Sequence, residues 1–349
     1  MEKSITLTDC TQKKRIEWID IAKGIGMVLV MLGHAQIPYV SPFCDEISIQ
    51  DVFLYSFHIP LFMFLSGLCF SDKDIKFSEF FKKKFKSLVV PYIFFAIVSV
   101  AAQCVIDFVT NHSLSIHTLL NEVKAVTIQI RAHTIWFLAC LVFLELAFYF
   151  IKKICNNHHF KIAIVTLIFL ICGIVYRKFV AINLPWNIDL VPMLMPFFAA
   201  GYCVKSVINS PLTKKHSLLF VLAVIINQGV NLINLKFFSP HFIDVYSNAY
   251  GNYILFFISA FSGIYAMVLF CKYFDGKMKI FQYIGRNSLI FLGLHRFVFF
   301  IARMLLDKLN LSDIVTTVGW LFAIVITLAV LSLLNEIIIR TPFKFVLGK

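Results

Sequence analysis

The chain has 349 residues, of which 60% are apolar and only 15% are charged, and its net charge is +13. Water-soluble domains carry about 25% charged residues, so this composition excludes a soluble globular protein, and 39 Phe residues exclude a disordered one. An excess of Lys and Arg would suit a nucleic-acid-binding protein, but it is also typical of the inner loops of membrane proteins. The composition therefore indicates an integral membrane protein and not a partner of nucleic acid.

Long apolar runs predict the fold class. A membrane-spanning helix needs about 20 mostly apolar residues, and such runs recur along the whole chain. They lie at residues 18–38, 51–71, 87–109, 133–151, 161–179, 188–207, 217–235, 251–273, 284–305 and 314–339. The sequence therefore predicts an all-α polytopic membrane protein with about ten transmembrane helices in a single domain, 1–349.

The distribution of basic residues predicts the orientation. Most of the 32 Lys and Arg residues fall in the N-terminal tail, in alternate loops and at the C-terminal end. Because basic loops stay in the cytoplasm, both termini are expected on the cytoplasmic side of the cell's inner (plasma) membrane. The nine Cys residues show no disulfide or metal-site spacing, so no metal site is predicted.

Ionisable residues inside the apolar runs are costly and usually face a cavity or a partner. They are Asp20, Lys23, His34, His58, Glu145, His295 and Arg296. Structural explanations compete with functional ones: Asp20 could be a solvated boundary residue, Glu145 a buried neutral acid, and His58 a hydrogen-bonding partner of nearby backbone.

Lys23 and His34 give the strongest signal among these residues. They are eleven residues apart, which is close to three helical turns, so their side chains share one helix face about 16 Å apart along the axis. A cation at the cytoplasmic mouth and an imidazole three turns deeper would suit a ligand with an anionic head and a long thin arm. The competing explanation is that two unrelated polar residues happen to align.

Four blocks of the sequence resemble the acyltransferase family 3 membrane proteins. The blocks are Arg15, Asp20, Lys23 and His34; the segment from Phe57-His58-Ile59-Pro60 to Ser66-Gly67; Trp136-Phe137-Leu138 with Glu145; and Gly285 and Ser288 with Leu294-His295. The first two blocks are specific and the others are looser. The segment Trp18–Gly26 looks most like the fucose-acetylase-like subgroup. Many family members have Arg where this chain has Lys23, which gives phosphate a point charge instead of a bidentate fork.

The resemblance implies transfer of an acyl group, most often acetyl, from cytoplasmic acyl-CoA to a hydroxyl of a sugar or surface glycan on the outer side. It implies an O-acetyltransferase that uses acetyl-CoA as a donor substrate, with no bound cofactor. Expected partners are acyl-CoA, the glycan acceptor, the lipid bilayer and proteins of glycan assembly.

Roles for the site residues follow from this resemblance and from their depth in the membrane. His34 is expected to be the general base, with Glu145 as the carboxylate that orients it. Lys23, Arg15 and Arg296 are expected to bind acyl-CoA, although Arg296 could instead pair with Glu145. Acceptor-binding or supporting roles are expected for Asp20, His58, Ser66, Trp136 and His295.

Two interpretations from other protein classes compete with this one. A secondary transporter with a buried His/Glu proton relay would also have ten helices and intramembrane ionisable groups. A structural membrane protein would give no reason for the Glu, Arg and His residues inside its helices. The sequence also leaves open whether the acyl group passes directly or through an acyl-enzyme on Ser66 or Cys140.

Overall fold

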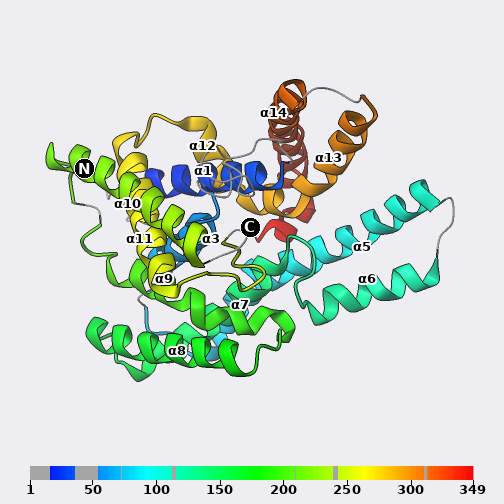
Figure 1. Cartoon of the computed structure of the whole chain (residues 1–349). Coiled ribbons are helices and arrows are strands. Elements are labelled where there is room, and N and C mark those ends of the chain that lie inside the picture. Colours follow the sequence, from blue (N-terminus) through cyan, green and yellow to red (C-terminus); the bar gives the residue numbers. More distant parts are fainter. Residues whose placement is uncertain are drawn as a thin grey trace, which may run out of the picture.

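The computed structural model describes residues 16–35, 54–71, 73–111, 115–208, 210–238, 243–309 and 313–348. Over these ranges the chain is a bundle of helices (Figure 1) with no strand beyond one isolated bridge between Asp244 and Ala249. The predicted all-α fold is therefore confirmed. Arg15 and the predicted helix ends at 36–38 and 51–53 lie outside the described residues.

Each predicted apolar run overlaps a helix, although the bounds differ. These helices are α1 (Glu17–His34), α3 (His58–Cys69), α5 (Val90–Asn111), α7 (Trp136–Ile154), α8 (His159–Phe179), α9 (Val191–Cys203), α10 (Lys215–Phe238), α11 (Tyr253–Tyr273), α13 (Ser288–Leu309) and α14 (Asp313–Ile339). Shorter helices that the apolar runs do not predict are α4 (Phe77–Lys84), α6 (Ile116–Ile128) and α12 (Lys279–Arg286).

Six helical stretches among the described residues are long and apolar enough to cross a membrane. They are Phe77–Thr110, His159–Phe179, Lys215–Phe238, Tyr253–Tyr273, Ser288–Leu306 and Val315–Ile339. The protein is thus a multi-pass membrane protein. Helices α3 and α9 have only 12 and 13 residues, and α1 and α7 carry three charged residues each, so the number of ten spans stays a prediction.

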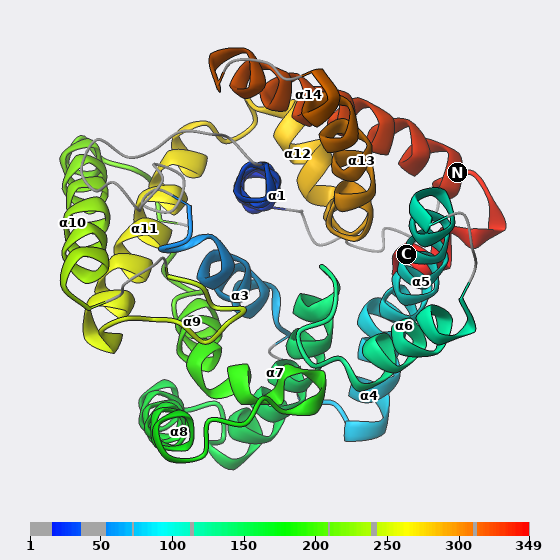
Figure 2. The same ribbon diagram turned by 45° about the vertical axis from the view of Figure 1, so that its right-hand side comes forward.

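Helix α1 lies inside the bundle. Figure 2 shows it end-on, and it packs against α3, α11, α12 and α13. Most residues of α1 and α7 are buried, whereas α8, α10 and α14 expose many apolar side chains, as a lipid-facing surface requires. The more polar helices are therefore the inner ones, because their charged groups are satisfied by protein and not by lipid.

Two glycines bring α1 and α12 into backbone contact. A Cβ atom at Gly24 would lie 2.0 Å from the carbonyl oxygen of Phe281, and one at Gly285 would lie 1.9 Å from that of Asp20. Only glycine permits this approach, as at other close helix contacts in membranes. The contact places the end of α12, and with it the start of α13, beside the Lys23 turn of α1.

We expect Gly285→Ala to destabilise the protein by about 1–3 kcal/mol, because the added methyl group overpacks this contact. The measurement is thermal unfolding of the detergent-solubilised protein. Gly229→Ala is the matched control, because nothing lies within 4 Å of a Cβ at that position. Equal melting temperatures for the two variants would contradict the close packing of α1 on α12.

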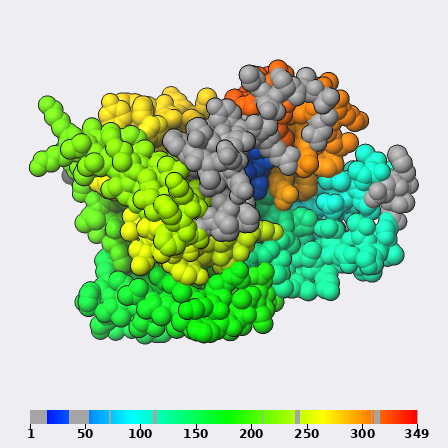
Figure 3. Space-filling model, viewed as in Figure 1, coloured from blue at the N-terminus to red at the C-terminus, as the bar shows by residue number. Residues whose placement is uncertain are grey.

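Helices α5 and α6 form an arm that projects from the bundle (Figures 1 and 3). The Tyr92 hydroxyl donates to the carbonyl of Val126 and accepts from Gln129 Nε2 at 3.0 Å, which ties the two helices at the base of the arm. Helix α6 escapes sequence prediction because it has 13 residues, too few for a span.

The predicted run 284–305 is not one helix. The chain breaks at Asn287, between α12 and α13, where the Asn287 side chain donates to the Tyr283 carbonyl at 2.8 Å. A polar side chain that bonds to nearby backbone competes with helix continuation. The break gives Arg286 and Ser288 a position beside the site that a continuous helix would not provide.

Candidate active site

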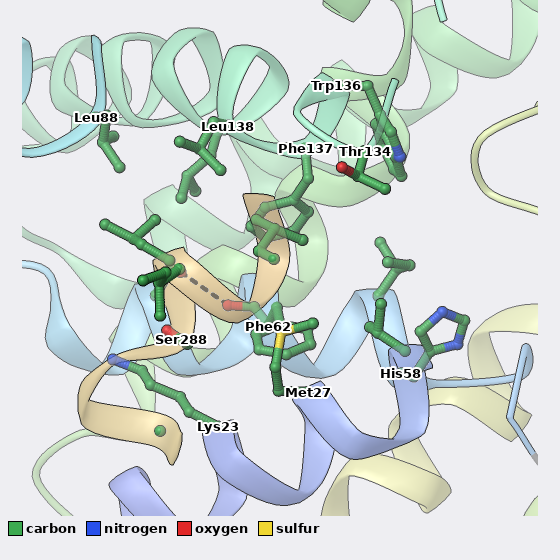
Figure 4. A pocket seen from close by; sticks show the side chains of 18 of the residues that line it. Lys23, Met27, His58, Phe62, Leu88, Thr134, Trp136, Phe137, Leu138 and Ser288 are labelled. Carbon is green, nitrogen blue, oxygen red and sulfur yellow. Dashed lines mark hydrogen bonds between the residues drawn. The ribbon is translucent and has the colours of Figure 1, made fainter. Parts of the chain in front are cut away.

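A cavity of about 650 Å³ is lined by α1, α3, α4, α7, α12, α13 and the loop that contains Asp244 and Tyr246. Figure 4 shows Lys23 and Ser288 on one side of it and His58 on the other, with Met27 and Phe62 between them. His34 also lines this cavity. The cavity therefore contains both Lys23 and His34, which are about 16 Å apart along α1, as their shared helix face predicts.

One end of the cavity is basic, and we call it the basic end: Lys23, Lys84 and Arg286 line it. Lys84 Nζ lies 2.6 Å from Glu145 Oε2, and its ammonium lies 5.5 Å from the centre of the Phe70 ring. Lys23 Nζ lies 3.7 Å from the sulfur of Cys69. Arg286 is paired with Asp20 and Lys84 with Glu145, so Lys23 leaves a surplus of one positive charge among these side chains.

Asp20 has a structural partner at the basic end. Its Oδ2 accepts from Arg286 Nε at 3.1 Å, and its side chain is 4% exposed whereas that of Arg286 is 42% exposed. Asp20 is therefore not a solvated boundary residue. It anchors Arg286, and through it α12, beside α1.

The opposite end holds histidines, and we call it the histidine end. The His34 and His295 ring centres are 5.2 Å apart, and His295 is fully buried while His34 is exposed to the cavity. His58 Nδ1 lies 2.7 Å from the Leu54 carbonyl. The Tyr55 hydroxyl donates to the Gly33 carbonyl at 2.9 Å, which fixes the end of α1 against the start of α3.

Trp136, Tyr246, Asp244 and His133 also line the cavity. The rings of Trp136 and Tyr246 meet edge to face at 5.6 Å, and His133 Nε2 lies 2.8 Å from Glu122 Oε2. Burial raises the pKa of the Tyr246 hydroxyl, which stays protonated and donates to the Arg131 carbonyl. Aromatic faces beside polar groups are suited to sugar rings, which are amphipathic.

A buried ion pair supports this end from behind. Arg131 contacts Asp189 at 2.5 Å and donates to Asn187 Oδ1 at 2.8 Å, and Asn248 donates to Asp189 Oδ2 at 2.7 Å. Asn187 also donates to the Trp136 carbonyl at 3.3 Å. These polar residues hold loops together around Trp136, so their role is structural.

The structure separates two residues that the sequence analysis placed together. Glu145 is at the basic end in an ion pair with Lys84, whereas Arg296 lines the cavity and directly follows His295, whose ring neighbours His34 at the histidine end. The expected contacts of Glu145 with His34 or Arg296 are thus replaced by the pair with Lys84. Glu145 lies at the middle of α7, where Lys84 of α4 reaches its carboxylate.

Other predicted residues are placed as follows. Ser66 lines the cavity, but its hydroxyl donates to the Phe62 carbonyl at 2.8 Å, and Cys140 is fully buried outside the lining. The sequence analysis missed Lys84 and Arg286. Lys84 belongs to the run Lys82-Lys83-Lys84, in which nothing distinguishes a binding residue from topological charge.

These observations define a class: a multi-pass helical membrane protein whose inner helices enclose a cavity with a basic end and a histidine end. The chain belongs to acyltransferase family 3, because the family model described as an acyltransferase domain matches residues 16–336. The protein is therefore a membrane acyltransferase. No curated protein and no solved structure matches the chain, and the match does not resolve the subgroup within the family.

The ion pair predicts the behaviour of Glu145→Gln. We expect this variant to weaken binding of the acyl donor about 10-fold or more. The Lys84 ammonium loses the carboxylate that positions it and becomes an unpaired, largely buried cation. The measurement is the KM for acetyl-CoA. An unchanged KM with a strongly reduced kcat would instead favour the role of orienting His34.

Proposed function

We propose that the protein is an O-acetyltransferase that moves an acetyl group from acetyl-CoA to a hydroxyl of a sugar or surface glycan on the other side of the membrane. The observation that carries this proposal is the cavity that joins Lys23, Lys84 and Arg286 to His34. A donor that must present its acetyl group to an acceptor across the membrane needs such a passage, since its polyanionic nucleotide head cannot enter the hydrocarbon.

The basic end suits the donor's phosphates. Hydrogen bonds between ammonium or guanidinium groups and phosphate are short and strong, and Lys84 is only 24% exposed, so solvent screening is reduced. The pantetheine arm would then lie along the mostly apolar middle of the cavity, which Met27 and Phe62 line. This arrangement would deliver the thioester to His34.

The chemistry at the histidine end is a direct acyl transfer. Neutral His34 takes the proton of the acceptor hydroxyl while its oxygen attacks the thioester carbonyl carbon. The tetrahedral oxyanion then collapses, the carbon–sulfur bond breaks, and His34 returns the proton to the CoA thiolate. Arg296, close to His34, is placed to stabilise the oxyanion rather than the distant phosphates.

Direct transfer fits the cavity better than an acyl-enzyme. Ser66 already donates its hydrogen bond to backbone, and Cys140 is not in the lining. Neither has the adjacent base that an activated nucleophile requires. The aromatic pair of Trp136 and Tyr246 offers a surface against which a sugar acceptor would pack.

The orientation of the reaction follows from charge. The basic end adjoins α4, whose last turn is Lys82-Lys83-Lys84, and such segments stay cytoplasmic. The donor would therefore enter from the cytoplasm of the inner (plasma) membrane, and the acceptor from outside.

The test uses purified protein in lipid vesicles, radiolabelled acetyl-CoA and a panel of hexose and deoxyhexose methyl glycosides. We expect release of CoA thiol together with label in a glycoside, and in intact cells an acetyl mass on surface glycans that a deletion strain lacks. Absence of both would contradict the proposal. Uptake of a solute without acetyl transfer would instead favour the transporter.

A further inference from the structure

His295 is a fully buried histidine whose tautomer is fixed by its own helix. Its Nδ1 lies 2.8 Å from the Phe291 carbonyl oxygen and 3.1 Å from that of Leu292. Carbonyl oxygens only accept hydrogen bonds, so Nδ1 must carry the proton. The lone pair of the neutral ring is therefore on Nε2.

That lone pair has no partner. Nε2 of His295 is buried and makes no hydrogen bond in the part of the chain that the structure describes. An unsatisfied buried polar atom of this kind costs about 1–3 kcal/mol, which requires an explanation. The His295 ring is held in place by Phe299, which meets it edge-on at 5.9 Å.

The ring of His34 is a neighbour of the His295 ring. The two ring centres are 5.2 Å apart and the ring planes are tilted by 32°, which is short enough for facing ring nitrogens to approach hydrogen-bond distance. His295 lies outside the cavity lining while His34 is part of it, so His295 lies behind the base as seen from the cavity. Catalytic hydrogen bonds are often long without substrate and tighten in the complex.

His34 needs such a partner. Among the described residues no carboxylate bonds to it, since Glu145 is engaged by Lys84 at the basic end and Asp244 accepts from Tyr246 and Ser247. A histidine base requires a group that fixes its tautomer, so that one nitrogen faces the substrate with a lone pair.

We propose that His295 is the positioning residue of His34, and that its Nε2 accepts a hydrogen bond from the ring N–H of His34. This inference rests on the proposed function. The bond leaves the second nitrogen of His34 unprotonated and directed into the cavity. When His34 takes the acceptor's proton, the imidazolium keeps its other N–H bonded to His295, and no proton passes to His295.

The decisive comparison is between His295→Asn and His295→Gln. An Asn side chain places a donor near the position of Nδ1 and keeps the hydrogen bond to the Phe291 carbonyl, but it is too short to place an acceptor at the position of Nε2. A Gln side chain places an acceptor oxygen at the depth of Nε2. By analogy with the partners that orient metal-bound histidines, loss of the partner costs about 10–100-fold.

We expect kcat for CoA release from acetyl-CoA to fall by about 10–100-fold in His295→Asn, with an unchanged KM for acetyl-CoA, and to be largely retained in His295→Gln. Equal kcat losses in the two variants, or no loss in either, would overturn the inference. The melting temperature of each variant in detergent separates unfolding from the loss of positioning.

A second readout does not depend on turnover. With ¹⁵N-labelled histidine, the ring nitrogens of His34, assigned by comparison with His34→Ala, report its tautomer. We expect one tautomer in the parent protein and in His295→Gln, and a mixture in His295→Asn. A mixture in the parent protein would contradict the inference, whereas a fixed tautomer without any CoA release would leave it standing and contradict the proposed function alone.

Discussion

His34→Ala is expected to lower acetyl transfer by about 10²–10⁴-fold, the usual contribution of a general base. His34 is the histidine of α1 that lines the cavity, about 16 Å along the helix from Lys23. The measurement is kcat for acetyl transfer in lipid vesicles. We expect binding of CoA, measured by titration, to be unchanged, because the phosphates would be held at the basic end.

The control for this variant is His117→Ala. His117 is exposed on α6, where Asn121 is its hydrogen-bonding partner, so its removal tests whether loss of any histidine disturbs the protein. Near-parental turnover in His34→Ala would remove His34 from the mechanism. Loss of activity in both variants would point to a general effect on folding, which the melting temperature would show.

Lys84→Ala is expected to raise the KM for acetyl-CoA by about 10–100-fold, since a hydrogen bond to a charged group contributes about 1.5–3 kcal/mol. Removal of Lys84 also leaves Glu145 buried with no counter-ion at 2.6 Å, which adds repulsion between its carboxylate and the donor phosphates. Lys23→Ala should act in the same direction. The measurement is CoA affinity by calorimetric titration together with KM.

The chain supplies a closely matched control in Lys83→Ala. Lys83 is the adjacent residue in α4, but its side chain is 61% exposed and its partner at 2.7 Å is Glu79, also exposed. Exposed pairs of this kind contribute little. If Lys83→Ala weakened acetyl-CoA binding as much as Lys84→Ala did, the effect would come from the general surface charge and not from a contact in the cavity.

The two ends of the site differ in how far sequence could predict them. Lys23 and His34 were predictable because both lie on one helix, and the helical repeat alone places them on one face. Lys84 was not, because a run of three lysines before an apolar segment is what topology also produces. Its distinguishing feature is burial beside Glu145, which depends on how α4 packs against α7.

The sequence by itself determined that this protein is helical, resides in a membrane and has a cation and a histidine aligned on its first helix. These are local properties, set by hydropathy and by the helical repeat. Only the tertiary structure decided which groups meet. It paired Glu145 with Lys84 rather than with His34, broke the predicted 284–305 helix at Asn287, and placed His295 behind His34. Such pairings depend on the relative depth and rotation of separate helices, which packing contacts such as that of Gly24 with Gly285 fix and which no single segment encodes.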